Sequence, residues 1–223
     1  MAAATTFREF DAETIAPCCK VNFHMNYPLR SIDYLERADA QRKLTSVANL
    51  RYAALELRCG IEARLKEYAS HAVGITKSQA REWEITKLGK TLDTAFGTGD
   101  TIFIIIIDLE SGLSGQFIYA PVTSRLQEIG KRLGFYLHAQ SADTYNEEEY
   151  LTHLKSLLHE GCGLLRLACS GEVLRPTIQH GLQLVLDADD PRIKIVEAIQ
   201  AGERKRIQIL NIDPVGAMTF YDR

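Results

Sequence analysis

The chain has 223 residues, a length that suits one domain, or one domain with a small appendage, and that can bury a substantial core without metals or disulfides. Hydrophobic residues make up 46% and charged residues 25%, which is ordinary for a globular protein. The formal net charge of -3 excludes the overall basicity typical of nucleic-acid or anionic-membrane binding, but it leaves room for a local basic patch.

The cysteine pattern indicates free thiols. The chain has five cysteines, no CxxC motif and no secretory leader at its start, so we expect reduced thiols in a cytoplasmic protein. Cys18 and Cys19 are adjacent and lack a second ligand pair, which argues against a zinc site. The longest aliphatic-aromatic run, residues 102–107, is too short to cross a bilayer. We therefore expect no metal, no cofactor and no membrane span.

The first part of the chain divides into an irregular arm and a long helix. Prolines and scattered polar residues interrupt any period in residues 1–40, which we interpret as an N-terminal arm with a short helix at 31–38. Residues 41–72 carry the strongest helical pattern, with apolar residues at three- and four-residue steps, and should form the longest helix. Three apolar residues of this helix are expected in the core: Leu55, Ile61 and Leu65.

Charged residues lie beside the apolar stripe of this helix. Arg51 and Arg58 fall close to the stripe, and Glu62 follows Arg58 by four residues, which places these two side chains on neighbouring turns. One interpretation is a structural ion pair at the edge of the core. The other is a row of polar side chains that faces a functional site.

The middle of the chain predicts a second helix and then a β-hairpin. A sparse apolar side favours a helix over residues 78–95, and a glycine-rich turn follows at 97–100. Because that turn precedes a strand and lacks the GK[ST] motif, we do not expect it to bind phosphate. Residues 101–109 are rich in β-branched side chains and residues 116–122 resume strand character, which indicates a β-hairpin.

Two further helices follow the hairpin. Thr123 or Ser124 should cap a helix that runs to about His138. A capping-box pattern within residues 144–149 then starts another helix, which Gly171 closes.

The tail changes period. Strict alternation over residues 178–186 predicts a half-buried strand, and residues 192–199 and 205–211 are interpreted as two more strands. The acidic turn at 187–191 lacks EF-hand spacing and is interpreted as solvated rather than metal-binding.

We therefore predict an α+β fold: a mainly helical bundle with a β-hairpin insert and a small antiparallel C-terminal sheet. The expected parts are an N-terminal arm at 1–40, a bundle at 41–172 with its insert at 101–122, and C-terminal antiparallel strands at 173–223 that pack on the bundle.

One short stretch pairs a candidate acid–base group with a candidate phosphate-binding group. Residues 131–138 read Lys-Arg-Leu-Gly-Phe-Tyr-Leu-His, which places Arg132 and His138 on one amphipathic helix with five residues between them. Two other Arg–His pairs have a similar spacing but do not lie on a late helix: Arg64 with His71, and Arg175 with His180.

This stretch resembles the HEPN family, helical bundles whose late helix carries Arg, four to six intervening residues and then His. The resemblance covers roughly residues 41–170 and implies metal-independent RNA cleavage, with the site often completed across a dimer. His138 would then transfer a proton at the ribose 2′-hydroxyl or the leaving oxygen, and Arg132 would hold the phosphate. The resemblance also implies supporting roles for a further set of residues: Lys131, Tyr136, Arg51, Arg58 and Glu62.

Helix geometry leaves an alternative open. Residues six apart are offset by about 120° around an α-helix, so Lys131, and not Arg132, shares a stripe with His138. A long arginine side chain or a bend at Gly134 could bridge the offset. In the alternative, the three residues are structural. His138 then interacts favourably with the helix dipole at the C-terminal end, Arg132 lies on the surface, and Tyr136 packs against the core.

Two function classes follow from the sequence. The first is a HEPN-like endoribonuclease of the toxin or defence kind, with RNA as substrate and a homodimer as its expected form. The second is a non-catalytic interaction protein that uses the bundle or a sheet edge to bind a protein partner, or a small ligand in a pocket between bundle and sheet. Basic groups lie near His138 in sequence: Arg125, Lys131 and Arg132. Glu128 lowers the net positive charge of this stretch.

Overall fold

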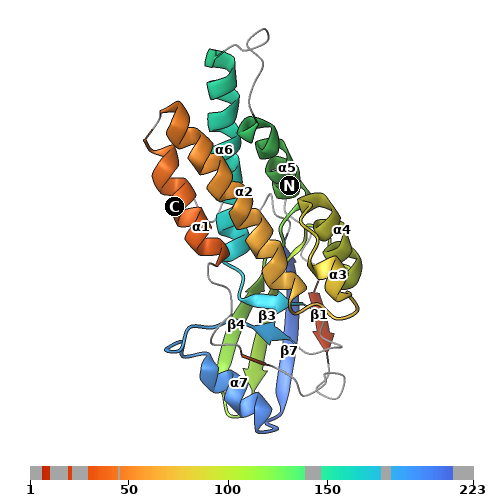
Figure 1. The fold of residues 1–223 in the computed structure, drawn as a ribbon. Coiled ribbons are helices and arrows are strands. Elements are labelled where there is room, and N and C mark those ends of the chain that lie inside the picture. The colour runs from red at the N-terminus through yellow and green to blue at the C-terminus, as the bar shows by residue number, and fades with distance from the viewer. Residues whose placement is uncertain are drawn as a thin grey trace.

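The computed structural model describes residues 7–10, 20–21, 30–44, 46–138, 147–176 and 182–212. Long helices stand above one end of a small sheet, and a short helix lies against that sheet (Figure 1). The fold is α+β and mainly helical, as predicted. Among the helices in the described ranges, none combines the length and the apolar character that spanning a bilayer requires.

The helices of the described chain have these bounds: α1 Ser31–Arg42, α2 Val47–Ala69, α3 Lys77–Ala80, α4 Ile85–Phe96, α5 Ser124–Leu137, α6 Glu147–Cys169 and α7 Ile193–Gln200. The predicted helix over residues 41–72 is therefore two helices, because Ser46 starts α2 by accepting a hydrogen bond from the backbone N–H of Asn49. With 23 residues, α2 is as long as α6.

Strands of the described chain form two sheets. The larger has the order β1-β7-β3-β4 and is antiparallel throughout: β1 Phe7–Phe10, β7 Lys205–Ile212, β3 Ile102–Leu109 and β4 Ser114–Tyr119. The smaller joins β2 Lys20–Val21, β6 Gln183–Leu184 and β5 Val173–Arg175, and β2 runs parallel to β6.

The predicted hairpin is the centre of the larger sheet, not an insert separate from a C-terminal sheet. Strand β3 pairs with β4 on one side and with β7 on the other, from Ile102 opposite Ile212 to Leu109 opposite Lys205. The two sides satisfy the backbone groups of β3, whose alternate residues are buried.

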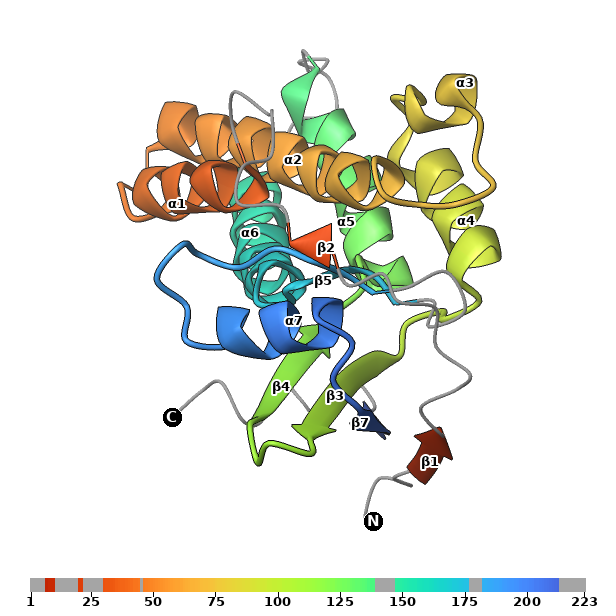
Figure 2. The ribbon, with the colours of Figure 1, turned by 90° about the horizontal axis from the view of Figure 1, so that it is seen from below.

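The tail contains one helix that the sequence analysis interpreted as a strand. Residues 192–199 were expected to be extended, but α7 occupies this region and buries Ile195, Val196 and Ile199, a spacing that suits one helix face. Ile195 rests on β4, because a Cβ at Gly115 would come within 2.5 Å of its Cδ1. Figure 2 shows α7 beside β3 and β4. The predicted strand at 178–186 is described from residue 182 onward and contains β6.

The predicted arm overlaps the bundle. The helix expected at 31–38 is confirmed, but α1 extends to Arg42 and buries Leu35 and Ala38 against α2. The boundary proposed at residue 40 therefore falls inside a packed helix.

The centre of the bundle is α2, which contacts α1, α4, α5 and α6. Ile61 and Leu65 are buried in this core, as predicted. The prediction for Leu55 is wrong, since 44% of it is exposed. Leu57, two residues further along the same helix, lies in the core and packs against Gly161 of α6.

Candidate functional site

Helix α5 carries the residues that the HEPN resemblance singles out. Thr123 caps it, as predicted, by accepting a hydrogen bond of 3.2 Å from the backbone N–H of Leu126. The helix ends at Leu137, and His138 follows as the C-cap in an extended conformation. Arg132 and His138 are both exposed, so both are accessible to a ligand.

The neighbouring cations Arg132 and Lys131 act on carboxylates of different helices. The pKa of Glu160 on α6 is lowered mainly by its hydrogen bond with Arg125 and partly by the nearby charge of Arg132. Lys131 instead acts on the carboxylate of Glu84, at the start of α4, whose pKa is lowered chiefly by Lys87. The charge of Arg132 thus acts on a carboxylate of α6, and that of Lys131 on a carboxylate at the start of α4.

Helical spacing puts position 138 about 120° from Arg132 around the axis, and His138 itself leaves the helix as its extended C-cap. Within the described ranges, no hydrogen bond joins Arg132 to His138. Their joint action within one chain stays a prediction.

Arg58 approaches α5 on its α2 side. Its Nε donates a hydrogen bond of 3.2 Å to Glu62, so the ion pair expected from their spacing is present. A Cβ at Gly134 would lie 2.5 Å from the Nη1 of Arg58, which shows that the guanidinium rests directly on α5. Glycine at position 134 thus allows this approach.

A second arginine of α2 is held by an aromatic pair. Arg51 donates from Nε to the Tyr150 hydroxyl at 3.2 Å, and its guanidinium carbon lies 5.7 Å from the centre of that ring. The Tyr150 hydroxyl donates in turn to the backbone carbonyl of Tyr136 at 3.1 Å, and the two rings are 5.0 Å apart. Burial raises the pKa of Tyr136, consistent with a packing role for its ring.

Tyr150 links α2, α5 and α6, and sequence reasoning missed it. The available signal was an aromatic residue in the first turn of α6, one of many such positions in the chain. The supporting residues Arg51, Arg58, Glu62 and Tyr136 are thus all found where α2 meets the end of α5.

An open groove of about 480 Å³ lies on this face of the bundle. Five of its lining residues come from α2 and one from α5: Val47, Ala48, Arg51, Tyr52, Leu55 and Leu137. Its floor is mostly apolar, and 60% of Tyr52 is exposed at its edge. We call this feature the α2–α5 groove.

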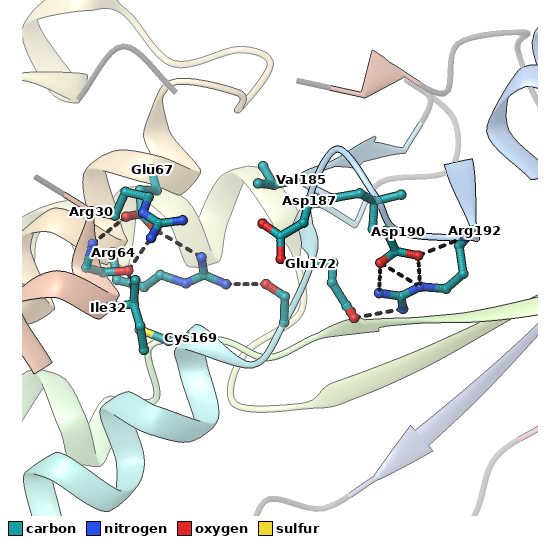
Figure 3. A pocket seen from close by; sticks show the side chains of 13 residues that line it. Arg30, Ile32, Arg64, Glu67, Cys169, Glu172, Val185, Asp187, Asp190 and Arg192 are labelled. Atoms are coloured by element: carbon teal, nitrogen blue, oxygen red, sulfur yellow. Dashed lines mark hydrogen bonds and ion pairs between the residues drawn. The ribbon is translucent and has the colours of Figure 1, made fainter. Parts of the chain in front are cut away.

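A second, more enclosed pocket of about 250 Å³ lies between the bundle and the sheets (Figure 3). One wall is a buried ion pair: Arg64 donates to Glu67 from Nη1 at 2.9 Å, to the Tyr68 hydroxyl from Nε at 3.0 Å, and to the Gly171 carbonyl from Nη2 at 2.6 Å. Glu67 also accepts from the backbone N–H and the hydroxyl of Ser31, at 2.7 and 2.9 Å. We call this pocket the junction pocket.

The opposite wall is also made of charged side chains in ion pairs. Glu172 accepts from the backbone N–H of Ile118 at 2.9 Å and from Nη1 of Arg192 at 2.8 Å. Arg192 also donates to Asp190 at 2.6 Å, and this contact lowers the pKa of Asp190. Figure 3 shows the carboxylate of Asp187 between the two walls.

Chemistry in the junction pocket is limited by these contacts. The Cys169 thiol lines the pocket and donates to the hydroxyl of Ser31 at 3.3 Å, and burial raises its pKa, which keeps it protonated and weakly nucleophilic. In the described part of the chain, no group of three or more His, Cys, Asp or Glu side chains is arranged to hold a metal ion.

The Arg64–His71 pair does not form a second Arg–His site. The donors of Arg64 are committed to Glu67, Tyr68 and Gly171, and burial lowers the pKa of His71. The 175–180 pair extends beyond the described residues, since His180 lies between 176 and 182.

Comparison with known proteins identifies no relative: no family model, no curated protein and no solved structure matches this chain.

Proposed function

We propose that the chain is a metal-independent endoribonuclease of the HEPN-like kind, acting as a toxin or defence protein. The observation that carries this proposal is the exposed imidazole of His138 at the end of α5, with the exposed cations Lys131 and Arg132 in the two preceding turns. Imidazole groups are suited to proton transfer near neutral pH, and guanidinium groups are suited to binding phosphate.

The reaction would be an internal transesterification. His138 accepts the proton of a ribose 2′-hydroxyl, the 2′-oxygen attacks the adjacent phosphorus, and the bond from phosphorus to the 5′-oxygen breaks. The departing 5′-oxygen takes up a proton, which leaves a 2′,3′-cyclic phosphate and a 5′-hydroxyl. Arg132 would offset the charge that develops on the phosphate oxygens in the transition state.

A homodimer would reconcile this chemistry with the geometry of α5. Because Arg132 and His138 lie about 120° apart around the helix, one chain presents them to different sides. Two copies that face each other along α5 could place Arg132 of one copy beside His138 of the other.

The proposal is tested with purified protein, a set of single-stranded and structured RNAs, and EDTA. We expect cleavage that survives EDTA, is abolished in His138→Ala and is unchanged in His159→Ala, a control that removes another exposed histidine. Mixing His138→Ala with Arg132→Ala tests the dimer, since a shared site restores part of the activity in mixed dimers. Equal cleavage by wild type and His138→Ala would refute the role of His138.

The junction pocket supports a second candidate, the binding of a small polar ligand. Its enclosed volume and its charged walls, which include Arg64, Glu67 and Glu172, suit a molecule with both donors and acceptors. Native mass spectrometry of the purified protein would reveal a co-purifying molecule as a mass above that of the chain. A mass equal to that of the chain alone, together with RNA cleavage that depends on His138, would favour the first proposal.

A further inference from the structure

Two arginines of α2 are held in a fixed orientation and keep donors that make no hydrogen bond: Arg51, which lines the α2–α5 groove, and Arg58, seven residues further along the helix. Arg51 is held through Nε by Tyr150, and Arg58 is held through Nε by Glu62. Within the described chain, neither has a hydrogen bond from its terminal nitrogens Nη1 and Nη2. Arg51 therefore keeps both terminal nitrogens for a phosphate group, which can accept two parallel hydrogen bonds from them, whereas Nη1 of Arg58 packs against Gly134 and leaves Nη2 as its unused donor.

This arrangement differs from that of other anchored arginines in the molecule. Arg64, Arg125 and Arg192 all use at least one terminal nitrogen in a hydrogen bond to a carboxylate or carbonyl oxygen. Each of these three is paired with a carboxylate through a terminal nitrogen, whereas Arg58 is paired with Glu62 through Nε alone. Arg51 and Arg58 combine a fixed orientation with unused donors, so the binding of an anion costs little side-chain entropy.

Both arginines lie on the same face of α2. Residues seven apart are almost in line and about 10.5 Å apart along the helix axis. Between them lies the half-exposed Leu55, which lines the α2–α5 groove together with Arg51. The face therefore alternates a cation, an apolar surface and a second cation.

This face leads to the end of α5. The Nη1 of Arg58 lies against Gly134, and Gly134 precedes His138 by four residues, so the two positions are neighbours on adjacent turns. Arg58 therefore contacts α5 four residues before His138, the C-cap of that helix.

We propose that Arg51 and Arg58 bind the phosphate backbone of single-stranded RNA and carry it along the α2–α5 groove to His138. This inference rests on the proposed ribonuclease function. Single-stranded RNA fits better than a duplex because the groove has an apolar floor and an exposed ring, Tyr52, on which an unstacked base can lie. In this arrangement Arg58 positions the scissile phosphate, and Gly134 leaves room for the guanidinium, which a Cβ at this position would shift.

The test measures binding without cleavage. In the His138→Ala background, binding of a fluorescent oligouridine is followed by anisotropy over a range of salt concentrations. We expect Arg58→Ala and Arg51→Ala each to weaken binding by about tenfold or more, as for the removal of a charge-assisted hydrogen bond. Each should also lower the slope of log K against log salt by about 0.7 for every phosphate group that the variant no longer neutralises.

Two further variants separate position from charge. Gly134→Ala keeps every charge and adds a residue that favours helix, yet it should weaken binding because the new Cβ meets Nη1 of Arg58. Arg81→Ala removes one exposed positive charge from the end of α3, away from the groove, and should leave affinity and salt slope unchanged. A duplex of the same length should bind more weakly than the single strand.

The outcomes distinguish this inference from the proposed function. If wild type cleaves RNA through His138 while Arg58→Ala and Arg51→Ala bind like their parent, the inference is overturned and the ribonuclease proposal stands. If no form cleaves but binding depends on Arg51, Arg58 and Gly134, the phosphate-binding groove is supported and the catalytic proposal fails. Equal weakening of binding in Arg81→Ala and Arg58→Ala would also overturn the inference, because it would show a nonspecific charge effect.

Discussion

Replacing Glu67 with alanine tests whether the buried ion pair holds the bundle to the sheets. The Glu67 carboxylate accepts three hydrogen bonds, two from Ser31 at the start of α1 and one from Arg64. Only 2% of the Glu67 side chain and 6% of the Arg64 side chain are exposed. The variant therefore leaves a buried guanidinium without its counter-charge.

The expected decrease in the free energy of unfolding is about 3–5 kcal/mol, the usual cost of removing one partner of a buried pair. Arg64 would keep its bonds to the Tyr68 hydroxyl and the Gly171 carbonyl, which hold the guanidinium in its present place. Replacing both partners, as in Arg64→Met with Glu67→Met, should cost less than the sum of the two single changes, because no unpaired charge remains.

Urea denaturation followed by circular dichroism gives the unfolding free energy of each variant. The matched control is Glu160→Ala, which breaks the pair between Arg125 and Glu160, whose side chains are 48% and 35% exposed. Such a surface pair should contribute no more than about 1 kcal/mol. If Glu67→Ala and Glu160→Ala prove equally mild, the buried pair does not stabilise the junction and the reasoning is wrong.

Two other stability measurements follow from the structure. Leu57→Ala should lower the free energy of unfolding by about 2–5 kcal/mol, because Leu57 is fully buried against α6, whereas Leu55→Ala should cost less than about 1 kcal/mol; denaturation midpoints that rank them the other way would contradict the packing of α2. Arg192 lowers the pKa of Asp190 below its ordinary value of 3.8, so the ion pair stabilises the folded state above that value and this contribution disappears as the pH falls through the lowered pKa. Wild type should therefore lose more stability on acidification than Asp190→Asn, and parallel curves of unfolding free energy against pH would contradict that role.

Local patterns predicted the helices more reliably than the sheet. Helix α5 could be placed to within a residue because Thr123 is a good N-cap and the apolar residues after it keep a helical spacing. The partner of β3 could not be predicted in the same way. Strand β7 is almost a hundred residues away in sequence, and its pairing depends on the whole bundle fixing where the chain returns.

The misassigned segment at 192–199 shows a limit of short apolar patterns. Ile193, Ile195 and Ile199 fit an alternation that Glu197 interrupts, while Ile195, Val196 and Ile199 fit a helix, so periodicity alone could not separate the two. The tertiary structure decides, because α7 packs Ile195 onto Gly115 of β4.

Candidate site residues divided in a similar way. The spacing of Arg58 and Glu62 predicted their ion pair, because that contact lies within one helix. The contact of Arg51 with Tyr150 joins residues that are far apart in sequence, and no spacing rule could reveal it. The same holds for Arg64, whose bond to the Gly171 carbonyl joins residues that are 107 positions apart in sequence.

The arginines of the molecule differ in which of their nitrogens donate hydrogen bonds within the protein. This difference separates arginines that hold the fold together from arginines that can bind a ligand. At the junction pocket, Arg64 and Arg192 each bond to a backbone carbonyl as well as to a carboxylate, and each bond to a carbonyl joins elements that are distant in sequence. Removing such a side chain should loosen the fold. On α2, Arg51 and Arg58 are fixed through Nε alone, so replacing either with alanine breaks one bond to a side chain, that of Tyr150 or of Glu62, and none to a backbone carbonyl. Replacing Arg64 or Arg192 should therefore lower mainly the unfolding free energy. Replacing Arg51 or Arg58 should weaken mainly the binding of the ligand.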